Sequence, residues 1–245
     1  MLYKVKPGQV SYGEAIGILL LENYAPFIPG DTANATTYSY PVRFQRVPGL
    51  SVERIFKHDL SMYTKVKESA LELKKEGVRA ITGDCGFMAI YQWQLVEDLG
   101  IPVFHSSLLQ LPFMSLIIGK ARSIGVITAN SKSLTRDVFS WAGVTTELQK
   151  RLTVRGLEDC DAFADAAIRE TGELDSAALE AGVVERALEL QEQDTKLGAI
   201  LLECSMLPPY GAAVQEATGL PVFDFVTMIN FVHSTVVKEC FRGSM

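Results

Sequence analysis

The sequence predicts an α/β fold built from two related halves, each a parallel β-sheet with helices on both faces. Two observations lead to this prediction. Short, apolar, β-branched segments such as VRAITG (78–83) alternate along the chain with segments of helical period. In addition, residues 78–105 match residues 197–224 without a gap.

The repeat is carried by a cysteine and by the segment that follows it. Cys85 matches Cys204, and GIPVF (100–104) matches GLPVF (219–223) at the same distance after each cysteine. Each copy is typical of a strand, a cysteine, a helix and a second strand, because the glycine ends a helix and the proline cannot continue one. Such a βαβ unit crosses over right-handed onto a parallel sheet.

A weaker match extends the repeat to both halves of the chain. AIGILLLEN (15–23) resembles SIGVITANS (123–131), so each half starts with a similar strand. A solenoid would show several shorter units, and we therefore interpret the pattern as two duplicated lobes. We expect a first lobe at residues 1–118, with the C-terminal helix as a candidate to pack back on it, and a second lobe at residues 119–245. Further helices are expected at residues 61–77, 132–143 and 175–197.

Composition narrows the class of protein. The formal net charge of −6 argues against a nucleic-acid partner, which would usually need a basic surface. No apolar segment approaches the ~20 residues of a membrane span, and MLYKVKPGQVSYGEA at the N-terminus lacks the apolar core of a signal peptide. We therefore expect a cytoplasmic protein with no membrane partner. The four cysteines show no Cys-x-x-Cys spacing and the three histidines are scattered, which argues against a disulfide framework and a metal site.

Cys85 and Cys204 each follow a predicted strand and precede a predicted helix. Ligands of open α/β sheets bind at the carboxyl ends of strands, so we expect the two thiols to face each other across one cleft. A helix N-terminus carries partial positive charge, which would lower the thiol pKa and favour the thiolate. Two such thiols could remove a proton from one face of a carbon and deliver a proton to the opposite face.

With these motifs described, the sequence resembles the aspartate/glutamate/hydantoin racemase superfamily, which includes arylmalonate decarboxylase and maleate isomerase. The resemblance covers nearly the whole chain. It rests on the early Ile-Gly-Ile-Leu strand, on GDCGF (83–87) and on LLECSMLPPYGAAVQEATGLPVFDFV (201–226). It implies two pseudo-symmetric Rossmann-like halves with the active site in the cleft between them, no cofactor, and Cys85 and Cys204 as the catalytic acid/base pair. It also implies a homo-oligomer, a dimer or larger.

The implied function is a racemase or isomerase acting at a carbon next to a carboxylate or carbonyl. Amino-acid racemases of the superfamily usually carry Asn-Thr after the first cysteine and Thr after the second. Gly86 and Phe87, and Ser205 and Met206, stand at these positions as candidate substrate-binding residues. Because Phe87 and Met206 make the pocket more apolar, a cyclic amide such as a hydantoin, or a carboxylate with an apolar part, fits as well as aspartate or glutamate.

Other readings remain open at this point. Retention of both cysteines favours racemisation over decarboxylation, which needs one cysteine in the pattern of the superfamily. The alternatives are an arylmalonate-decarboxylase-like or maleate-isomerase-like enzyme, and a non-catalytic protein that binds small acids on the same scaffold. A thiol redox protein is disfavoured. The two cysteines lie on separate loops with a ligand-sized gap expected between them, whereas a disulfide needs Cα atoms within about 7 Å.

Asparagines at loops near the cleft are further candidates for substrate binding. Asn23 and Asn130 end the matched first strands, and Ser131 follows the second of them. Asn34 lies in PFIPGDTANATTY (26–38), a loop of the kind that forms a lid or a binding element. The alternative for all four residues is an ordinary turn or helix cap.

The remaining matched polar residues are expected to be structural. Tyr91 and Tyr210 lie more than a helical turn beyond the cysteines, where core packing is expected. His105 is expected to be a satisfied polar residue at a strand end. Asp84 and Glu203 precede the cysteines, and we expect them to point away and hold the loop, because a carboxylate beside a thiol raises its pKa.

Overall fold

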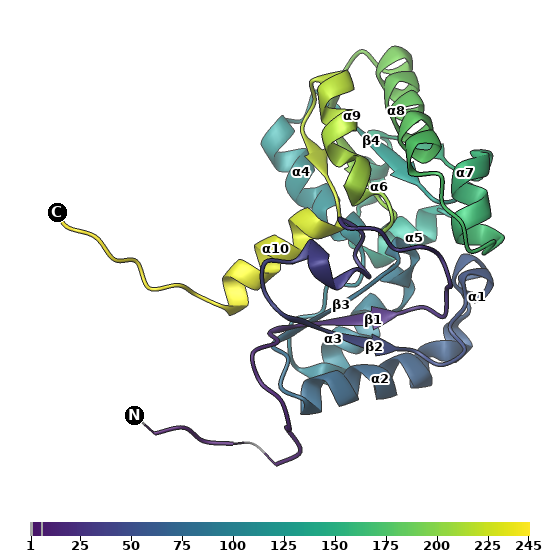
Figure 1. Cartoon of the computed structure of the whole chain (residues 1–245). Coiled ribbons are helices and arrows are strands. Elements are labelled where there is room, and N and C mark those ends of the chain that lie inside the picture. Colours follow the sequence, from purple (N-terminus) through teal and green to yellow (C-terminus); the bar gives the residue numbers. More distant parts are fainter. Residues whose placement is uncertain (1, 6) are drawn as a thin grey trace.

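The structure, a computed structural model, describes residues 2–5 and 7–245. It contains two parallel β-sheets flanked by helices, which confirms the predicted α/β class (Figure 1). The elements around the first sheet are β1 (Ile16–Leu20), η1 (Ala35–Thr37), β2 (Val42–Arg46), α1 (Val52–Phe56), η2 (Leu60–Met62), α2 (Tyr63–Lys75), β3 (Ala80–Gly83), η3 (Gly86–Tyr91), α3 (Gln92–Leu99) and η4 (Ser107–Gln110). The elements around the second sheet are α4 (Leu111–Ile118), β4 (Ser123–Thr128), α5 (Arg136–Trp141), α6 (Thr146–Gln149), β5 (Leu152–Gly156), α7 (Asp161–Phe163), the π-helix η5 (Ala164–Ile168), α8 (Ser176–Gln193), β6 (Leu197–Leu202), η6 (Pro208–Tyr210), α9 (Gly211–Thr218) and β7 (Val222–Phe223). The last helix, α10 (Phe225–Val236), returns to the first sheet.

The two sheets have the same strand order. The first runs β2-β1-β3, and Val103 adds a single parallel bridge to Ile81 at the β3 edge. The second runs β5-β4-β6-β7. In each lobe the first strand therefore lies between the second and the third, with the fourth segment outside the third. Because all pairs are parallel, β3 and β6 occupy equivalent places and their carboxyl ends carry the two matched cysteines.

A matched glycine in the first strand of each lobe lets a helix pack closely on the sheet. A Cβ atom on Gly17 would lie 2.9 Å from Cδ1 of Leu73 on α2. A Cβ atom on Gly125 would lie 2.9 Å from Cδ1 of Leu190 on α8. The Ile-Gly pattern at the start of each half thus marks the same helix-on-sheet contact in both lobes.

The last helix, α10, belongs to the second half of the sequence but packs on the first sheet. Phe225, Met228 and Ile229 are buried in one cluster with Ile16 and Ile18 of β1. Figure 1 shows this yellow helix lying beside the first lobe. Its N-cap, Asp224, accepts a hydrogen bond from the Thr227 N–H at 2.7 Å, which stabilises the first turn.

The further helices expected from the pattern are present as α2, α5 and α8. Across the part of the chain that the structure describes, none of the helices is both long and apolar enough to cross a lipid bilayer. Tyr91 and Tyr210 are buried, as expected for core residues, and their hydroxyls contact the Asp59 carbonyl and the Ser176 hydroxyl.

The segments that follow the cysteines differ from the expectation. An α-helix was expected directly after each cysteine. Instead, Gly86–Tyr91 forms the 3-10 helix η3, and α9 begins only at Gly211. Every residue of η3 is buried, so packing stabilises the tighter turns. In the second copy Pro208 and Pro209 lack N–H groups and are tolerated only before the regular helix begins. Neither cysteine therefore lies at the N-terminus of an α-helix.

Substitution of Gly125 by alanine should destabilise the fold. The added Cβ would meet Leu190 at 2.9 Å and Leu197 at 3.3 Å inside the second lobe. Overpacking of this kind costs about 1–3 kcal/mol, measured as the free energy of unfolding in urea. Gly243→Ala is the matched control, because nothing lies within 4 Å of the new methyl group. Equal stability of both variants would contradict the close helix-on-sheet contact.

Candidate active site

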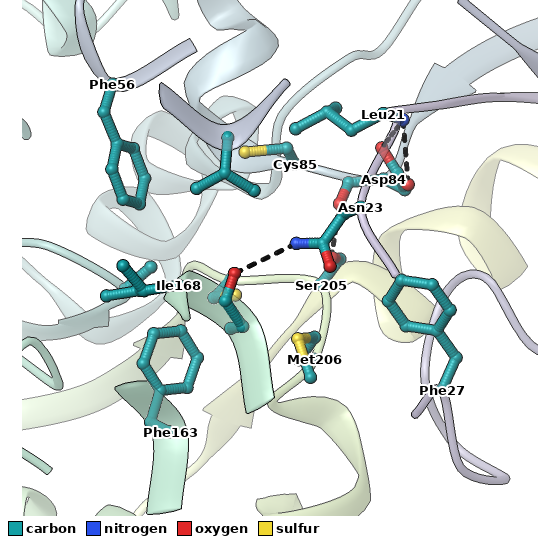
Figure 2. A pocket seen from close by; sticks show the side chains of 14 residues that line it. Leu21, Asn23, Phe27, Phe56, Asp84, Cys85, Phe163, Ile168, Ser205 and Met206 are labelled. Carbon is teal, nitrogen blue, oxygen red and sulfur yellow. Dashed lines mark hydrogen bonds between the residues drawn. The ribbon is translucent and has the colours of Figure 1, made fainter. Parts of the chain in front are cut away.

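A pocket lies where the two lobes meet (Figure 2). Both lobes contribute its walls. The lining residues are Leu21, Asn23, Phe27, Val52, Phe56, Asp84, Cys85, Ala129, Phe163, Ala167, Ile168, Cys204, Ser205 and Met206. The pocket thus lies at the carboxyl ends of β1, β3, β4 and β6, where ligands of parallel α/β sheets bind.

The two matched cysteines line this one pocket from different lobes. Cys85 follows β3 and is partly exposed, whereas Cys204 follows β6 and is 9% exposed. Both are free thiols. The charge of one thiolate would raise the pKa of the other thiol, which indicates that the two sulfurs are electrostatically coupled.

The walls of the pocket are mainly apolar and aromatic. Figure 2 shows the rings of Phe27, Phe56 and Phe163 placed around the space that Cys85 and Met206 also border. Of the described residues that line the pocket, none is a lysine, an arginine or a histidine. A bound anion would therefore depend on N–H and O–H donors, whereas a cation with an apolar shell could contact the aromatic rings directly.

Polar side chains tie the two lobes together around the pocket. Asn23 Nδ2 donates to the Ala167 carbonyl at 3.2 Å, the dashed line drawn in Figure 2, and Asn23 Oδ1 accepts from the Ala25 N–H at 2.9 Å. The Ser205 hydroxyl donates to the Asp84 carbonyl. These contacts leave the Asn23 amide occupied at both ends, so it positions the lobes as well as lining the pocket.

The loop 26–38 is held against the second lobe. The N–H and the hydroxyl of Thr32 both donate to the Ser205 carbonyl at 3.3 Å. Asp31, next to Thr32, is 1% exposed, and burial raises the pKa of its carboxyl well above its usual value. The sequence pattern placed the loop near the cleft but did not single out Asp31.

The pKa values of both thiols are raised in the structure, whereas the sequence predicted that a helix N-terminus would lower them. Burial raises the pKa of the Cys85 thiol, and the charges of Glu203 and Cys204 raise it further. Burial and then Glu203 also raise the pKa of the Cys204 thiol. The N–H groups of Phe87 and Met206 lower the two pKa values, but by less than burial raises them. The predicted helix effect is wrong because no α-helix begins at either cysteine.

The two matched acids beside the cysteines have different surroundings. Asp84 holds the loop as expected, because its carboxylate oxygens accept from the Leu21 N–H at 3.0 and 3.2 Å. Glu203 differs. Its Oε2 accepts from the Thr128 hydroxyl at 2.8 Å, while its Oε1 is buried with no hydrogen-bond partner among the described residues. Burial raises the pKa of both carboxyls to about 7.

The predicted substrate-binding residues fall into two groups. Asn23, Ser205 and Met206 line the pocket with the cysteines. The others lie outside its lining and are Asn34, Gly86, Phe87, Asn130 and Ser131.

Each residue of the second group has a local role in the structure. Asn130 Oδ1 accepts from the Lys132 and Ser133 N–H groups, and the Ser131 N–H donates to Glu158 at 3.1 Å. Asn34 caps η1 and donates to the Phe27 carbonyl at 2.9 Å. Their part in substrate binding stays a prediction.

The two residues after Cys85 lie behind the pocket wall. Phe87 is fully buried and packs edge-on against Phe56, with ring centroids 5.1 Å apart. Gly86 lies against Glu203. Phe87 therefore supports the aromatic wall from behind.

Sequence reasoning missed most of the apolar wall. Phe27 lies in the loop after β1, Phe56 ends α1, and Phe163 and Ile168 come from the α7–η5 segment. An apolar residue on a loop or a short helix gives no periodic pattern that distinguishes a pocket residue from a core residue, so the sequence did not mark these four. His105 was expected to be a satisfied polar residue, but both of its ring nitrogens are buried without a hydrogen-bond partner among the described residues. Burial lowers its pKa to about 4, so its ring is neutral near pH 7. No group of three or more His, Cys, Asp or Glu side chains that could hold a metal ion occurs in the described ranges.

Several solved structures of racemases and of a decarboxylase share this architecture. Allantoin racemase from Pseudomonas fluorescens has a TM-score of 0.64 and 19% identity, covering 91% of this chain and 91% of that chain. Glutamate racemase RacE1 from Bacillus anthracis has a TM-score of 0.58 and 16% identity, covering 91% and 81%. Unliganded arylmalonate decarboxylase has a TM-score of 0.56 and 14% identity, covering 93% and 94%. The fold is therefore that of the aspartate/glutamate/hydantoin racemase superfamily, as expected.

Comparison with curated sequences defines the family more narrowly. The chain is 34% identical over 228 residues to dimethylsulfoniopropionate lyase 5 of Emiliania huxleyi, covering 90% of this chain and 45% of the lyase. It is 33% identical over 223 residues to dimethylsulfoniopropionate lyase of Durusdinium sp. clade D, covering 89% and 73%. The chain belongs to the family of these lyases. It spans between about half and three quarters of the length of these two relatives. No family model matches the chain.

The buried acid at Glu203 should make stability depend on pH. Its pKa rises from 4.5 in the unfolded chain to about 7 in the fold, so the folded state binds the proton more tightly. The resulting stabilisation is complete below about pH 4.5 and is lost as the pH rises through about 7. Glu203→Gln should not show this loss of stability. Between pH 5 and pH 8 its free energy of unfolding should fall by less than that of the wild type, by a difference on the order of 2 kcal/mol.

Thermal unfolding midpoints at several pH values measure this difference. Glu216→Gln, an exposed substitution in the same lobe, is the control and should follow the wild-type protein. A Glu203→Gln profile parallel to that of the wild type would show that Glu203 does not hold a proton in the folded state.

Proposed function

We propose that the protein is a cofactor-independent lyase that removes a proton from the carbon next to a carboxylate and expels a sulfide from the neighbouring carbon. The proposed substrate is a 3-sulfoniopropionate, with dimethylsulfoniopropionate as its simplest member. The observation that carries this proposal is the presence of Cys85 and Cys204 in a single apolar pocket without a basic side chain among its described lining residues. The lyase relatives supply the substrate class.

The walls of the pocket suit a sulfonium group. A dimethylsulfonium centre is a cation covered by methyl groups, and such cations bind favourably over aromatic faces. Phe27, Phe56 and Phe163 provide those faces. The nearby carboxyls of Asp84 and Glu203 favour a positive charge whenever they are ionised. Apolar walls would favour free aspartate or glutamate far less, because the ammonium group of an amino acid needs hydrogen-bond acceptors.

The proposed reaction is a β-elimination. A cysteine thiolate takes the proton from the carbon next to the carboxylate, and the electron pair of that C–H bond forms the new carbon–carbon double bond. The bond from the β-carbon to sulfur breaks, and its electron pair leaves with sulfur as neutral dimethyl sulfide. The other product is acrylate, and the proton resides on the cysteine.

The substrate itself would help to form the thiolate. Burial and the neighbouring acids raise the pKa of both thiols. A bound sulfonium places a positive charge in the same pocket, and an opposite charge favours the thiolate. We place the substrate carboxylate near the backbone N–H group of Ser205, which lines the pocket, because backbone donors can hold the charge that develops during proton removal.

A racemase or isomerase of a small carboxylate or cyclic amide is the second candidate. It is favoured by one observation, which is that thiols from both lobes line the same pocket. Inversion of a carbon centre needs a base on one face and an acid on the other. Elimination needs only the base, because dimethyl sulfide leaves as a neutral molecule. Location in the cytoplasm and assembly into a dimer or larger oligomer stay predictions.

Cysteine variants separate the two candidates. We expect the wild-type protein to release dimethyl sulfide from dimethylsulfoniopropionate, measured by headspace gas chromatography. Cys85→Ser and Cys204→Ser should reduce the rate unequally, with the base variant losing roughly 100-fold or more. Cys240→Ser, which changes an exposed thiol, is the control and should keep full activity.

The racemase alternative has its own readout. Incubation in D2O with chiral amino acids, hydantoins or substituted malonates would reveal exchange of the proton next to the carboxylate by NMR. Inversion of one of these substrates, lost equally in both cysteine variants and without any release of dimethyl sulfide, would overturn the lyase proposal.

A further inference from the structure

The carboxyl of Glu203 is fully buried beside the pocket, behind the residues that line it. Glu203 follows the last residue of β6, Leu202, and directly precedes Cys204. The Thr128 hydroxyl holds Oε2 at 2.8 Å, and the Ser107 hydroxyl holds the Glu203 carbonyl at 2.9 Å. Oε1 has no hydrogen-bond partner among the described residues. A buried polar atom without a partner costs free energy and therefore calls for a physical explanation.

The duplication provides an internal comparison. Asp84 holds the equivalent position before Cys85, but both of its oxygens accept from the Leu21 N–H. Asp84 is therefore a structural anchor, whereas Glu203 keeps one oxygen available. The two lobes therefore differ at this position. Both carboxylate oxygens of Asp84 accept hydrogen bonds, whereas only one oxygen of Glu203 does.

The Oε1 atom of Glu203 lies toward the first lobe. A Cβ atom on Gly86 would fall 1.7 Å from Oε1 of Glu203. Only a glycine leaves room for the carboxyl at this place. Because Gly86 directly follows Cys85 and Glu203 directly precedes Cys204, the carboxyl lies between the two cysteine segments.

The charges around the two thiols are dominated by this one acid. After burial, Glu203 is the largest contributor to the raised pKa of both Cys85 and Cys204. Asp84 also raises both pKa values, and Asp31 raises that of Cys204. The pocket lining that the structure describes contributes no lysine or arginine to offset them. His105, in the segment before η4, is buried and neutral near pH 7.

We propose that Glu203 stores the proton of the reacting cysteine, so that the thiol and the carboxyl share one proton during turnover. This inference rests on the proposed lyase reaction. The Glu203 carboxylate accepts the thiol proton, which leaves a thiolate and a neutral carboxylic acid. The thiolate then takes the proton of the substrate carbon as the sulfide departs. The net proton of the elimination leaves Glu203 for solvent when the products dissociate.

Glu203 acts through the cysteines and is a positioning residue. In the structure Oε1 makes no hydrogen bond to either sulfur, so the proposed transfer requires a small movement of the side chains or a bridging water molecule. A neutral Glu203 also removes the like charge that would oppose the thiolate. Proton transfer and relief of repulsion thus occur in the same step.

Glu203→Gln distinguishes this role from a structural one because two readouts should move in opposite directions. Loss of the negative charge should lower the pH midpoint of thiol alkylation by iodoacetamide by about one unit or more, followed at Cys85 and Cys204 by mass spectrometry. Loss of the proton acceptor should lower kcat for release of dimethyl sulfide roughly 100-fold, with little change in KM. A merely structural defect would slow both reactions together.

Two further variants complete the test. Glu203→Asp keeps the ionisable group and should retain the wild-type pH dependence at a reduced rate. This variant keeps the proposal testable if the Glu203→Gln protein fails to fold. Glu216→Gln, on the exposed face of α9, should match the wild type in both readouts. Unchanged or increased turnover in Glu203→Gln would overturn the proposal.

Failure of the proposed function can be recognised separately. A wild-type protein that releases no dimethyl sulfide would reject the substrate. The alkylation midpoints would still decide whether Glu203 and the thiols share a proton, because iodoacetamide needs no substrate chemistry. An unchanged midpoint in Glu203→Gln would reject the shared proton whatever the substrate.

Discussion

The rest of the site depends on the close approach of two equivalent strand ends, β3 in the first lobe and β6 in the second. The Ser205 hydroxyl, after β6, donates to the Asp84 carbonyl, after β3. The Ser107 hydroxyl of η4, also in the first lobe, donates to the Glu203 carbonyl. This contact buries the polar groups of the segments that follow β3 and β6, and it places each cysteine on the wall of a shared pocket. The chemistry of the site follows from that burial.

Burial has two opposite consequences for the chemistry. It raises the pKa of Cys85 and Cys204, which disfavours the thiolate that proton removal requires. It also strengthens every electrostatic interaction inside the pocket, so that one charge of the right sign can have a large effect. A cationic substrate and a neutralised Glu203 both act in the direction that forms the thiolate. Under the proposed function, the thiolate therefore forms mainly when a ligand of matching charge is bound.

The apolar wall explains how one superfamily fold can serve different reactions. The strand ends and the paired cysteines belong to the duplicated scaffold. Phe27, Phe56 and Phe163 lie on the loop after β1 and on α1 and α7, outside the sheets. Loops and short helices at strand ends change without disturbing the sheets, and they determine which substrate is held against the thiols. Sequence identity to the lyases and structural similarity to the racemases are consistent with this division.

The sequence by itself determined the duplicated α/β fold and the pairing of Cys85 with Cys204, because both follow from local periodicity and an ungapped repeat. Matched residues of duplicated strands occupy equivalent sheet positions, so their convergence could be predicted. Only the tertiary structure decided the state of the thiols, the roles of Asp84 and Glu203, and the aromatic wall. Those properties depend on burial and on contacts between segments far apart in the chain, such as Glu203 against Gly86, and no local pattern encodes them.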